Sequence, residues 1–182
     1  MKTILSILTL TIASLAYSQV IIGDNIGTAS NKTSVLMEFA AGQNKGIILP
    51  YVTTLPSGIG LVEGTIILNA TNPTQAKVEF YNGSWNDLSN GNEGNVTTAL
   101  ADQLTSAVEA PEAKVIIGAS TTTANGVLVL ESSDKAMVLP MVDNTDDVIA
   151  PAPGMMVYIN KTGAKRLAVF NGNKWTFWKP SF

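Results

Sequence analysis

Residues 77–85 read KVEFYNGSW, and residues 166–175 read RLAVFNGNKW. In both stretches a run rich in apolar and aromatic residues leads into an Asn-Gly pair, and a Trp follows shortly after it. Tight β-hairpin turns favour Asn-Gly because these two residues tolerate a positive φ at the central turn positions. The two stretches therefore predict two hairpins, in which each Trp packs across from the aromatic residue that precedes its turn.

The similarity between these stretches extends upstream, in the same order. Four more segments match: VIIG at 20–23 with VIIG at 115–118, SVL at 34–36 with GVL at 126–128, GIILP at 46–50 with AMVLP at 136–140, and GTIIL at 64–68 with GMMVY at 154–158. The spacing between the two sets changes only at places that suit loops, where insertions are tolerated. The chain therefore contains two diverged copies of one unit.

Each copy consists of short runs rich in Val, Ile, Leu and Tyr, bounded by Gly, Pro, Asn and Ser, which is typical of β-strands. The predicted fold is mainly β: two homologous small β-sheet and hairpin modules, joined by a linker and one short α-helix. The predicted boundaries are a signal peptide at 1–18, β module 1 at 19–90, a linker at 91–114 that holds a helix at 97–110, and β module 2 at 115–182 with an aromatic C-terminal tail.

The helix is predicted because residues 97–110 contain no Gly or Pro, and Leu100 and Leu104 share one face at helical spacing. Pro111 ends it. A helix with a narrow apolar stripe can cover the sheet of its own module or pair with copies of itself. The covering role is the favoured interpretation, and the pairing role makes Leu100 and Leu104 candidate interaction residues.

The first residues are typical of a secretory signal. Lys2 precedes an apolar stretch at 4–15, and Ala16 and Ser18 supply small residues at the two positions that a signal peptidase reads. An apolar core of about a dozen residues is short for a membrane span, which needs about 20. We therefore expect export, a mature chain that begins at Gln19, and no direct membrane span.

Composition excludes several classes of chemistry. The chain has no His and no Cys, so a Ser-His-acid triad, a Cys nucleophile and a zinc site with nitrogen or sulfur ligands are ruled out. Its 11 basic and 14 acidic residues argue against nucleic-acid binding. The acids are scattered singly, which disfavours a glycosidase with paired carboxylates. Asp143–Asp147 is the best candidate for calcium, but it lacks the acid spacing and turn Gly of a helix-loop-helix calcium loop. We predict no enzymatic activity and no cofactor.

The order GIILP, GTIIL and VEFYNGSW resembles a module common in exported proteins of the Bacteroidota and also found in phage tail-fibre proteins. In that module a GφLPRMT strand precedes a GφφYN strand and a YNGxxW turn. The resemblance implies a structural role, and its tail-fibre members tend to be trimeric and rich in β-structure. The Arg that usually follows the Pro is absent, because Tyr51 and Met141 stand in its place. No contact of that Arg can be carried over.

Residues 175–182, WTFWKPSF, are the most aromatic stretch of the chain. Exposed apolar patches mark interfaces, which makes this tail a candidate contact surface. Its candidate interaction residues are Trp175, Phe177, Trp178 and Phe182. Exposed Trp rings also stack on sugars, so carbohydrate binding is the alternative.

We therefore expect a non-catalytic, exported structural or adhesive protein of a bacterial cell surface, either associated with the outer membrane or part of an extracellular assembly. Its expected partners are other surface or outer-membrane proteins, or copies of itself, with a trimer as one arrangement. The alternative function is that of a carbohydrate-binding surface module that uses exposed Trp residues.

Overall fold

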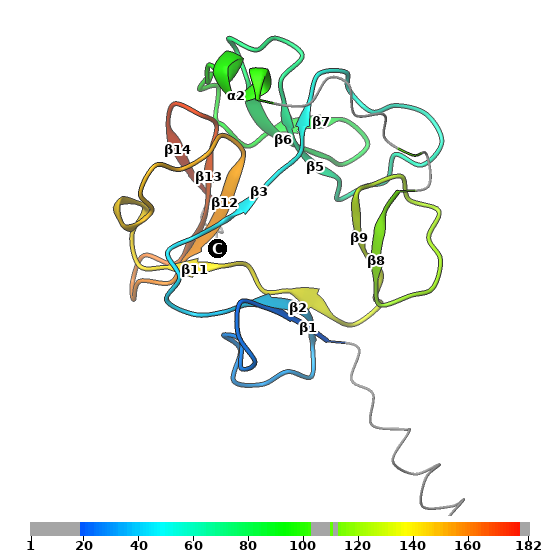
Figure 1. Ribbon diagram of the computed structural model, residues 1–182, viewed down its shortest axis with the longest axis vertical. Helices are drawn as coiled ribbons and strands as arrows, with labels where there is room; N and C mark the ends of the chain where they lie inside the picture. The colour runs from blue at the N-terminus through cyan, green and yellow to red at the C-terminus, as the bar shows by residue number, and fades with distance from the viewer. Residues whose placement is uncertain (1–18, 103–109, 111–112, 179–182) are drawn as a thin grey trace, which may run out of the picture.

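The structure is a computed structural model that describes residues 19–102, 110 and 113–178. Three predictions therefore fall wholly or partly outside the described residues: the signal peptide at 1–18, the helix beyond residue 102, and the end of the aromatic tail at 179–182. The described residues form short strands in four sheets, one helix, α2 (Thr97–Ala101), and one 3-10 turn, η2 (Thr145–Asp147) (Figure 1). The predicted mainly-β fold is confirmed.

The first predicted module, called repeat 1 below, contributes seven strands. They are β1 (Val20–Ile22), β2 (Val35–Phe39), β3 (Ile47–Ile48), β4 (Tyr51–Val52), β5 (Ile66–Asn69), β6 (Lys77–Tyr81) and β7 (Trp85–Asp87). Strands β1 and β2 run parallel, β4 runs parallel to β5, and β5, β6 and β7 form an antiparallel meander.

The second predicted module, called repeat 2, follows the same order. Its strands are β8 (Val115–Ile117), β9 (Leu128–Leu130), β10 (Ala136–Met137), β11 (Met141–Val142), β12 (Met155–Ile159), β13 (Arg166–Phe170) and β14 (Trp175–Trp178). The pairs β8·β9, β11·β12, β12·β13 and β13·β14 have the same directions as their counterparts in repeat 1. The duplication seen in the sequence is thus repeated in the strand pairing.

One segment of the sequence alignment is wrong by one residue. Val20 lies opposite Met37 and Val115 lies opposite Leu128, so Met37 is the counterpart of Leu128. The alignment of SVL with GVL assigns Leu36 to that position. A continuous apolar run such as Val35–Met37 lacks the alternation that would fix its register, which explains the error.

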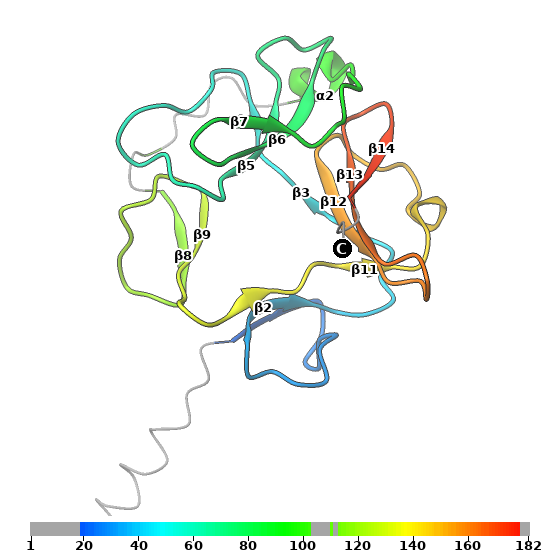
Figure 2. The ribbon, with the colours of Figure 1, turned by 180° about the vertical axis from the view of Figure 1, so that it is seen from behind.

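The two repeats exchange one strand each. Strand β3 leaves repeat 1 and pairs antiparallel with β12, whereas β10 leaves repeat 2 and pairs parallel with β2. Both views show β3 beside β12 and away from the sheet that contains β5, β6 and β7 (Figures 1 and 2). The sheets of the two repeats are therefore interlocked.

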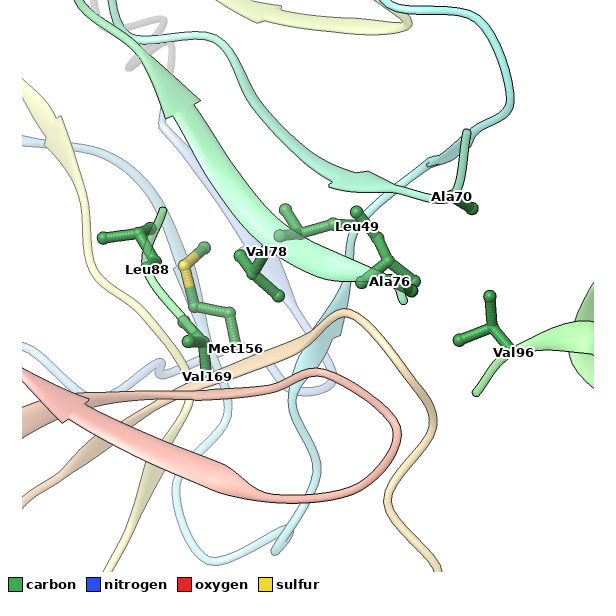
Figure 3. Packing of buried hydrophobic residues seen from close by; sticks show 9 residues of the cluster. Leu49, Ala70, Ala76, Val78, Leu88, Val96, Met156 and Val169 are labelled. Atoms are coloured by element: carbon green, nitrogen blue, oxygen red, sulfur yellow. The ribbon is translucent and has the colours of Figure 1, made fainter. Parts of the chain in front are cut away.

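The larger hydrophobic core is shared between the repeats. Leu49 and Val78 of repeat 1 pack with Met156 and Val169 of repeat 2 (Figure 3). Leu68 of repeat 1 belongs to the same cluster. Leu68, Val78 and Val169 are fully buried. A smaller cluster lies within repeat 2, around the central residues of β12 and β13. Burial of apolar surface is the main stabilising term in folding, so the two repeats stabilise one another.

Both predicted aromatic pairs are confirmed. The ring centroids of Tyr81 and Trp85 lie 5.3 Å apart, and those of Phe170 and Trp175 lie 5.3 Å apart. The turns between them are longer than a two-residue Asn-Gly turn, with three residues in repeat 1 and four in repeat 2. Gly83 alone has a positive φ in the first turn. The expectation of positive φ at both Asn and Gly is therefore wrong.

Candidate interaction surface

The aromatic strand β14 is partly buried and partly exposed. Trp175 is half-buried against Phe170 and packs on the core cluster of repeat 2. Phe177 is 44% exposed and Trp178 is 41% exposed. Phe182 lies outside the described residues. Of the four aromatic candidates, Phe177 and Trp178 therefore offer the surface to a partner.

Phe177 lies beneath a cationic side chain. The guanidinium carbon of Arg166, on the neighbouring strand β13, lies 4.3 Å from the centroid of the Phe177 ring. The Nε atom of Arg166 is buried without a hydrogen-bond partner in the described structure. The attraction of the cation to the face of the ring holds Arg166 in place. Both residues line a shallow hollow of about 300 Å³ together with Asp143 and Lys161.

The end of repeat 2 is fastened to the end of repeat 1. The carbonyl oxygen of Leu88 accepts hydrogen bonds from Thr176 Oγ1 at 2.7 Å and from Trp178 Nε1 at 2.8 Å. In the turn before β14, the Asn171 and Asn173 side-chain amides donate to the carbonyl oxygens of Asn92 and Glu93. The indole nitrogen of Trp178 thus has a partner within the chain, while the exposed part of its ring remains accessible.

Of the two candidate interaction residues on the predicted helix, the structure describes only Leu100. Leu100, on α2, is half-buried and packs against the shared core, as the covering role requires. Leu104 lies outside the described residues. The side chain of Asn95 accepts a hydrogen bond from Thr97 N at 3.1 Å at the start of the helix. Val96 is the N-cap residue of this helix.

The strand edges are a feature that the sequence analysis missed. One edge of β12 is fully used, because Met155 and Met156 pair with β3, and the residues that follow pair with β11. The same edge of β5 is only half used: Leu68 and Asn69 pair with β4, while the described residues provide no partner strand for the edge at Thr65 and Ile66. Repeat 1 therefore lacks the strand that β3 supplies to repeat 2.

A second open edge lies in repeat 2. Strand β2 is paired on both sides, by β1 and β10, whereas its counterpart β9 is paired only with β8 in the described structure. Leu128 on β9 is 42% exposed, and Ile48 on β3 is 53% exposed. An apolar strand with one unpaired edge is a ready template for pairing with another chain. Only the strand pairing in the structure shows which strands lack a partner, so these edges could not be found from the sequence.

Other kinds of site find little support among the described residues. They contain no group of three His, Cys, Asp or Glu side chains that could hold a metal ion. In the acidic segment considered for calcium, an Asp147 carboxylate oxygen accepts a hydrogen bond from Asn144 N at 3.2 Å and so caps the η2 turn. Within the part of the chain that is described, no helix combines the length and apolar character needed to cross a membrane.

A buried carboxylate in repeat 1 has a structural role. Glu38 on β2 is 0% exposed and accepts hydrogen bonds from Thr28 N at 2.7 Å, from Ala29 N at 2.8 Å and from the ammonium group of Lys32. Burial raises the pKa of Glu38, but these hydrogen bonds outweigh burial and hold its pKa below the usual range. The carboxylate therefore anchors the loop between β1 and β2.

The described strands are short, one strand of each repeat pairs with the other repeat, and two further strands have an open edge. A family model described as "Phage tail like trimerisation region" matches residues 116–181, which is most of repeat 2. This match supports the predicted resemblance to phage tail-fibre proteins. The comparisons with curated proteins and with solved structures gave no match.

Proposed function

We propose that this protein is a non-catalytic structural subunit that associates with two copies of itself in a fibre-like assembly outside the cell. The observation that carries the proposal is the match of residues 116–181 to a phage tail-like trimerisation region. The mainly-β fold fits a fibre-like role, since many fibre proteins are built from paired strands that continue from one chain to the next.

The open strand edges support self-association. The backbone N–H and C=O groups of an unpaired edge gain partners when a matching strand from another chain is added. The strand that repeat 1 lacks is of the same type as β3 and β10, so a second copy of the chain can supply it. Most soluble oligomers are closed and symmetric, and a three-fold ring is one of the common forms.

Export and a place at the bacterial surface complete the proposal. The signal-like sequence of residues 1–18 supports export, and the resemblance to exported modules supports a surface or outer-membrane-associated location. The exposed rings of Phe177 and Trp178 provide a further contact surface for other surface proteins.

The experiment is a mass measurement on the mature chain, residues 19–182, by size-exclusion chromatography with light scattering over a range of concentrations. We expect a species with three times the mass of one chain. A single-chain mass at every concentration would overturn the proposed trimer. Fractionation of the bacterial cell, with detection of the full-length and processed chain, tests the location separately.

A further inference from the structure

Strands β3 and β10 occupy the same place in the two repeats, yet each uses a different edge. In β3, the backbone N–H and C=O groups of Ile47 and Leu49 face β12, and Leu49 N donates to Gly154 O at 3.1 Å. In β10, the backbone of the alternate residues faces β2, because Ala136 N donates to Ser34 O at 2.9 Å and Val138 N donates to Met37 O at 2.8 Å. Successive residues of a strand direct their N–H and C=O groups to opposite sides. The two strands therefore show the two halves of one pairing scheme.

Together, the two pairings predict how successive repeats of this kind would join. We call β3 and β10 the β3-type strands, β2 and β9 the β2-type strands, and β5 and β12 the β5-type strands. A β3-type strand can join the β2-type strand of the preceding repeat by one edge and the β5-type strand of the following repeat by the other. Inside this chain each strand makes only one of the two pairings within the described residues. The edge of β3 at Gly46 and Ile48, and the edge of β10 at Met137, are left without a partner strand.

One additional repeat would fill every edge that the rule leaves open. Its β5-type strand would pair with β10, its β2-type strand would pair with β3, and its own β3-type strand would enter between β9 and β5. The four open edges thus match the complement of strands that a single repeat offers. Such complete complementarity is what a specific interface requires, since each buried backbone group then has a partner.

The loops that lead into β9 and β5 are in contact. Asn125 N, three residues before β9 of repeat 2, donates to Gly60 O, six residues before β5 of repeat 1, at 2.8 Å. A Cβ atom on Gly60 would lie 2.8 Å from Asn125 Cβ, so these segments are in close contact. The loops that precede the two edges that need the same missing strand are therefore already side by side, which favours closure after three repeats. In a longer or open series, β9 of one repeat and β5 of the repeat before it would belong to different sheets.

We propose that repeats of this kind form closed rings of three, that the single chain fills two positions of such a ring, and that in the assembly the same repeat from three copies of the chain fills the three positions. This inference rests on the proposed trimer, because three chains carry six repeats, the number that two complete rings need. A three-fold axis gives each ring the same repeat from all three chains. Formation of the trimer then exchanges the pairing of β3 with β12 inside one chain for equivalent pairings between chains, which is a form of domain swapping.

The two rings differ in one detail of packing. A Cβ atom on Gly46 would lie 2.8 Å from the carbonyl oxygen of Met156, so glycine allows β3 to approach β12 closely. Ala136 stands in the corresponding place on β10. In the ring made of three copies of repeat 2, β10 and β12 therefore sit slightly farther apart at this end than β3 and β12 do in the single chain.

Introduced cysteines test the ring directly, because the chain has no Cys of its own. Ile48 lies opposite Met155 in the antiparallel pair between β3 and β12, and Val138 is the counterpart of Ile48. Neighbouring side chains at a pair that is not hydrogen-bonded are close enough for a disulfide. In the variant with Val138→Cys and Met155→Cys, oxidation of the trimer should link each chain to the next and yield a covalent trimer on a non-reducing gel.

A matched control uses the same geometry inside one chain. In the variant with Ile48→Cys and Met155→Cys, oxidation at high dilution should form a disulfide within the chain and hold it as a single chain, and reductant should restore assembly. A second control, Val138→Cys with Ile59→Cys, places one thiol on a fully exposed loop and should give no covalent trimer.

The outcomes separate this inference from the proposed function. A wild-type chain that stays single by light scattering overturns the trimer itself. A wild-type trimer in which the Val138→Cys, Met155→Cys variant forms no links between chains leaves the trimer standing and overturns the ring. An oxidised Ile48→Cys, Met155→Cys chain that still assembles to the wild-type mass also overturns the ring, because assembly would then not require the exchange of β3.

Discussion

Ile47 of repeat 1 lies directly opposite Met156 of repeat 2, so a strand from the first half of the chain is a member of the second half's sheet. Gly46, the residue before Ile47, allows this approach, because a side chain there would meet Met156 O and the side chains of Met155 and Val157. The contact between the repeats is thus a continuous run of backbone pairing.

The substitution Gly46→Val should destabilise the chain. The added side chain would force β3 away from β12, and overpacking of this kind costs about 1–3 kcal/mol. Urea unfolding followed by far-ultraviolet circular dichroism measures the change. Gly126→Ala is a suitable control, since the nearest atom to its added Cβ is at 3.5 Å, and its unfolding free energy should change by less than about 0.5 kcal/mol.

The two hydrogen bonds to the Leu88 carbonyl should be non-additive. Trp178→Phe removes the indole donor and Thr176→Val removes the hydroxyl donor, but each single variant leaves the carbonyl with one partner. Each should cost about 1 kcal/mol of unfolding free energy. The double variant leaves a buried acceptor unpaired and should cost more than the two single losses together. Strict additivity in a double-mutant cycle would show that the carbonyl finds another donor.

Acid should remove the contribution of Glu38. Its hydrogen bonds hold the pKa of the folded state below the ordinary value of 4.5, so on acidification the unfolded chain binds a proton before the folded chain does. The stabilisation is therefore complete above the unfolded-state pKa and is lost as the pH falls through the folded-state pKa. The urea midpoints of the wild type and of Glu38→Gln should differ most near neutral pH and converge in acid. A difference that stays constant with pH would contradict this assignment.

The pair of Arg166 and Phe177 should contribute modestly to stability. Replacing Phe177 by Leu keeps an apolar side chain but removes the ring face, which should cost about 0.5–1 kcal/mol. The same replacement in an Arg166→Met background should cost less, because no cation remains to lose its partner. Thermal unfolding of the four proteins of this cycle gives the coupling, and a coupling near zero would show that the 4.3 Å contact has no energetic role.

Polysaccharides should not change the intrinsic Trp fluorescence of the mature chain. Trp85 and Trp175 are half-buried in aromatic pairs, and the indole nitrogen of Trp178 is bonded to Leu88 O. These positions favour a role of the Trp residues in the scaffold. A saturable shift with one class of sugar would contradict this prediction and favour the carbohydrate-binding alternative, in which case Trp178→Phe identifies the ring involved.

Local signals in the sequence predicted the local parts of the fold. Each hairpin is encoded by adjacent residues, so Tyr81 and Trp85, or Phe170 and Trp175, can be paired from spacing alone. The exchange of β3 and β10 could not be predicted, because each is a two-residue strand whose partner lies about 100 residues away along the chain. The local sequence of each strand, GIILP for β3 and AMVLP for β10, does not indicate which strand it pairs with. The open edges share this cause, since an edge is open only in relation to a partner elsewhere in the structure.

The sequence predicted an exposed aromatic contact surface at residues 175–182, and the structure describes only residues 175–178 of it. The exposure of Phe177 and Trp178 fits that expectation, while the bond from Trp178 to Leu88 is a long-range contact that the sequence does not encode locally. Whether the candidate residues form an interface remains a prediction, which the deletion of residues 178–182 tests: assembly should be lost while repeat 2 stays folded.

The buried carboxylate of Glu38 has no equivalent in repeat 2, where Val129 holds the matching place opposite Ile116. The two repeats thus share their strand scheme but not their internal chemistry, and in the proposed trimer each ring contains only one kind of repeat. A stack of two unlike rings has a distinguishable front and back, so a fibre built from this chain would be polar along its length.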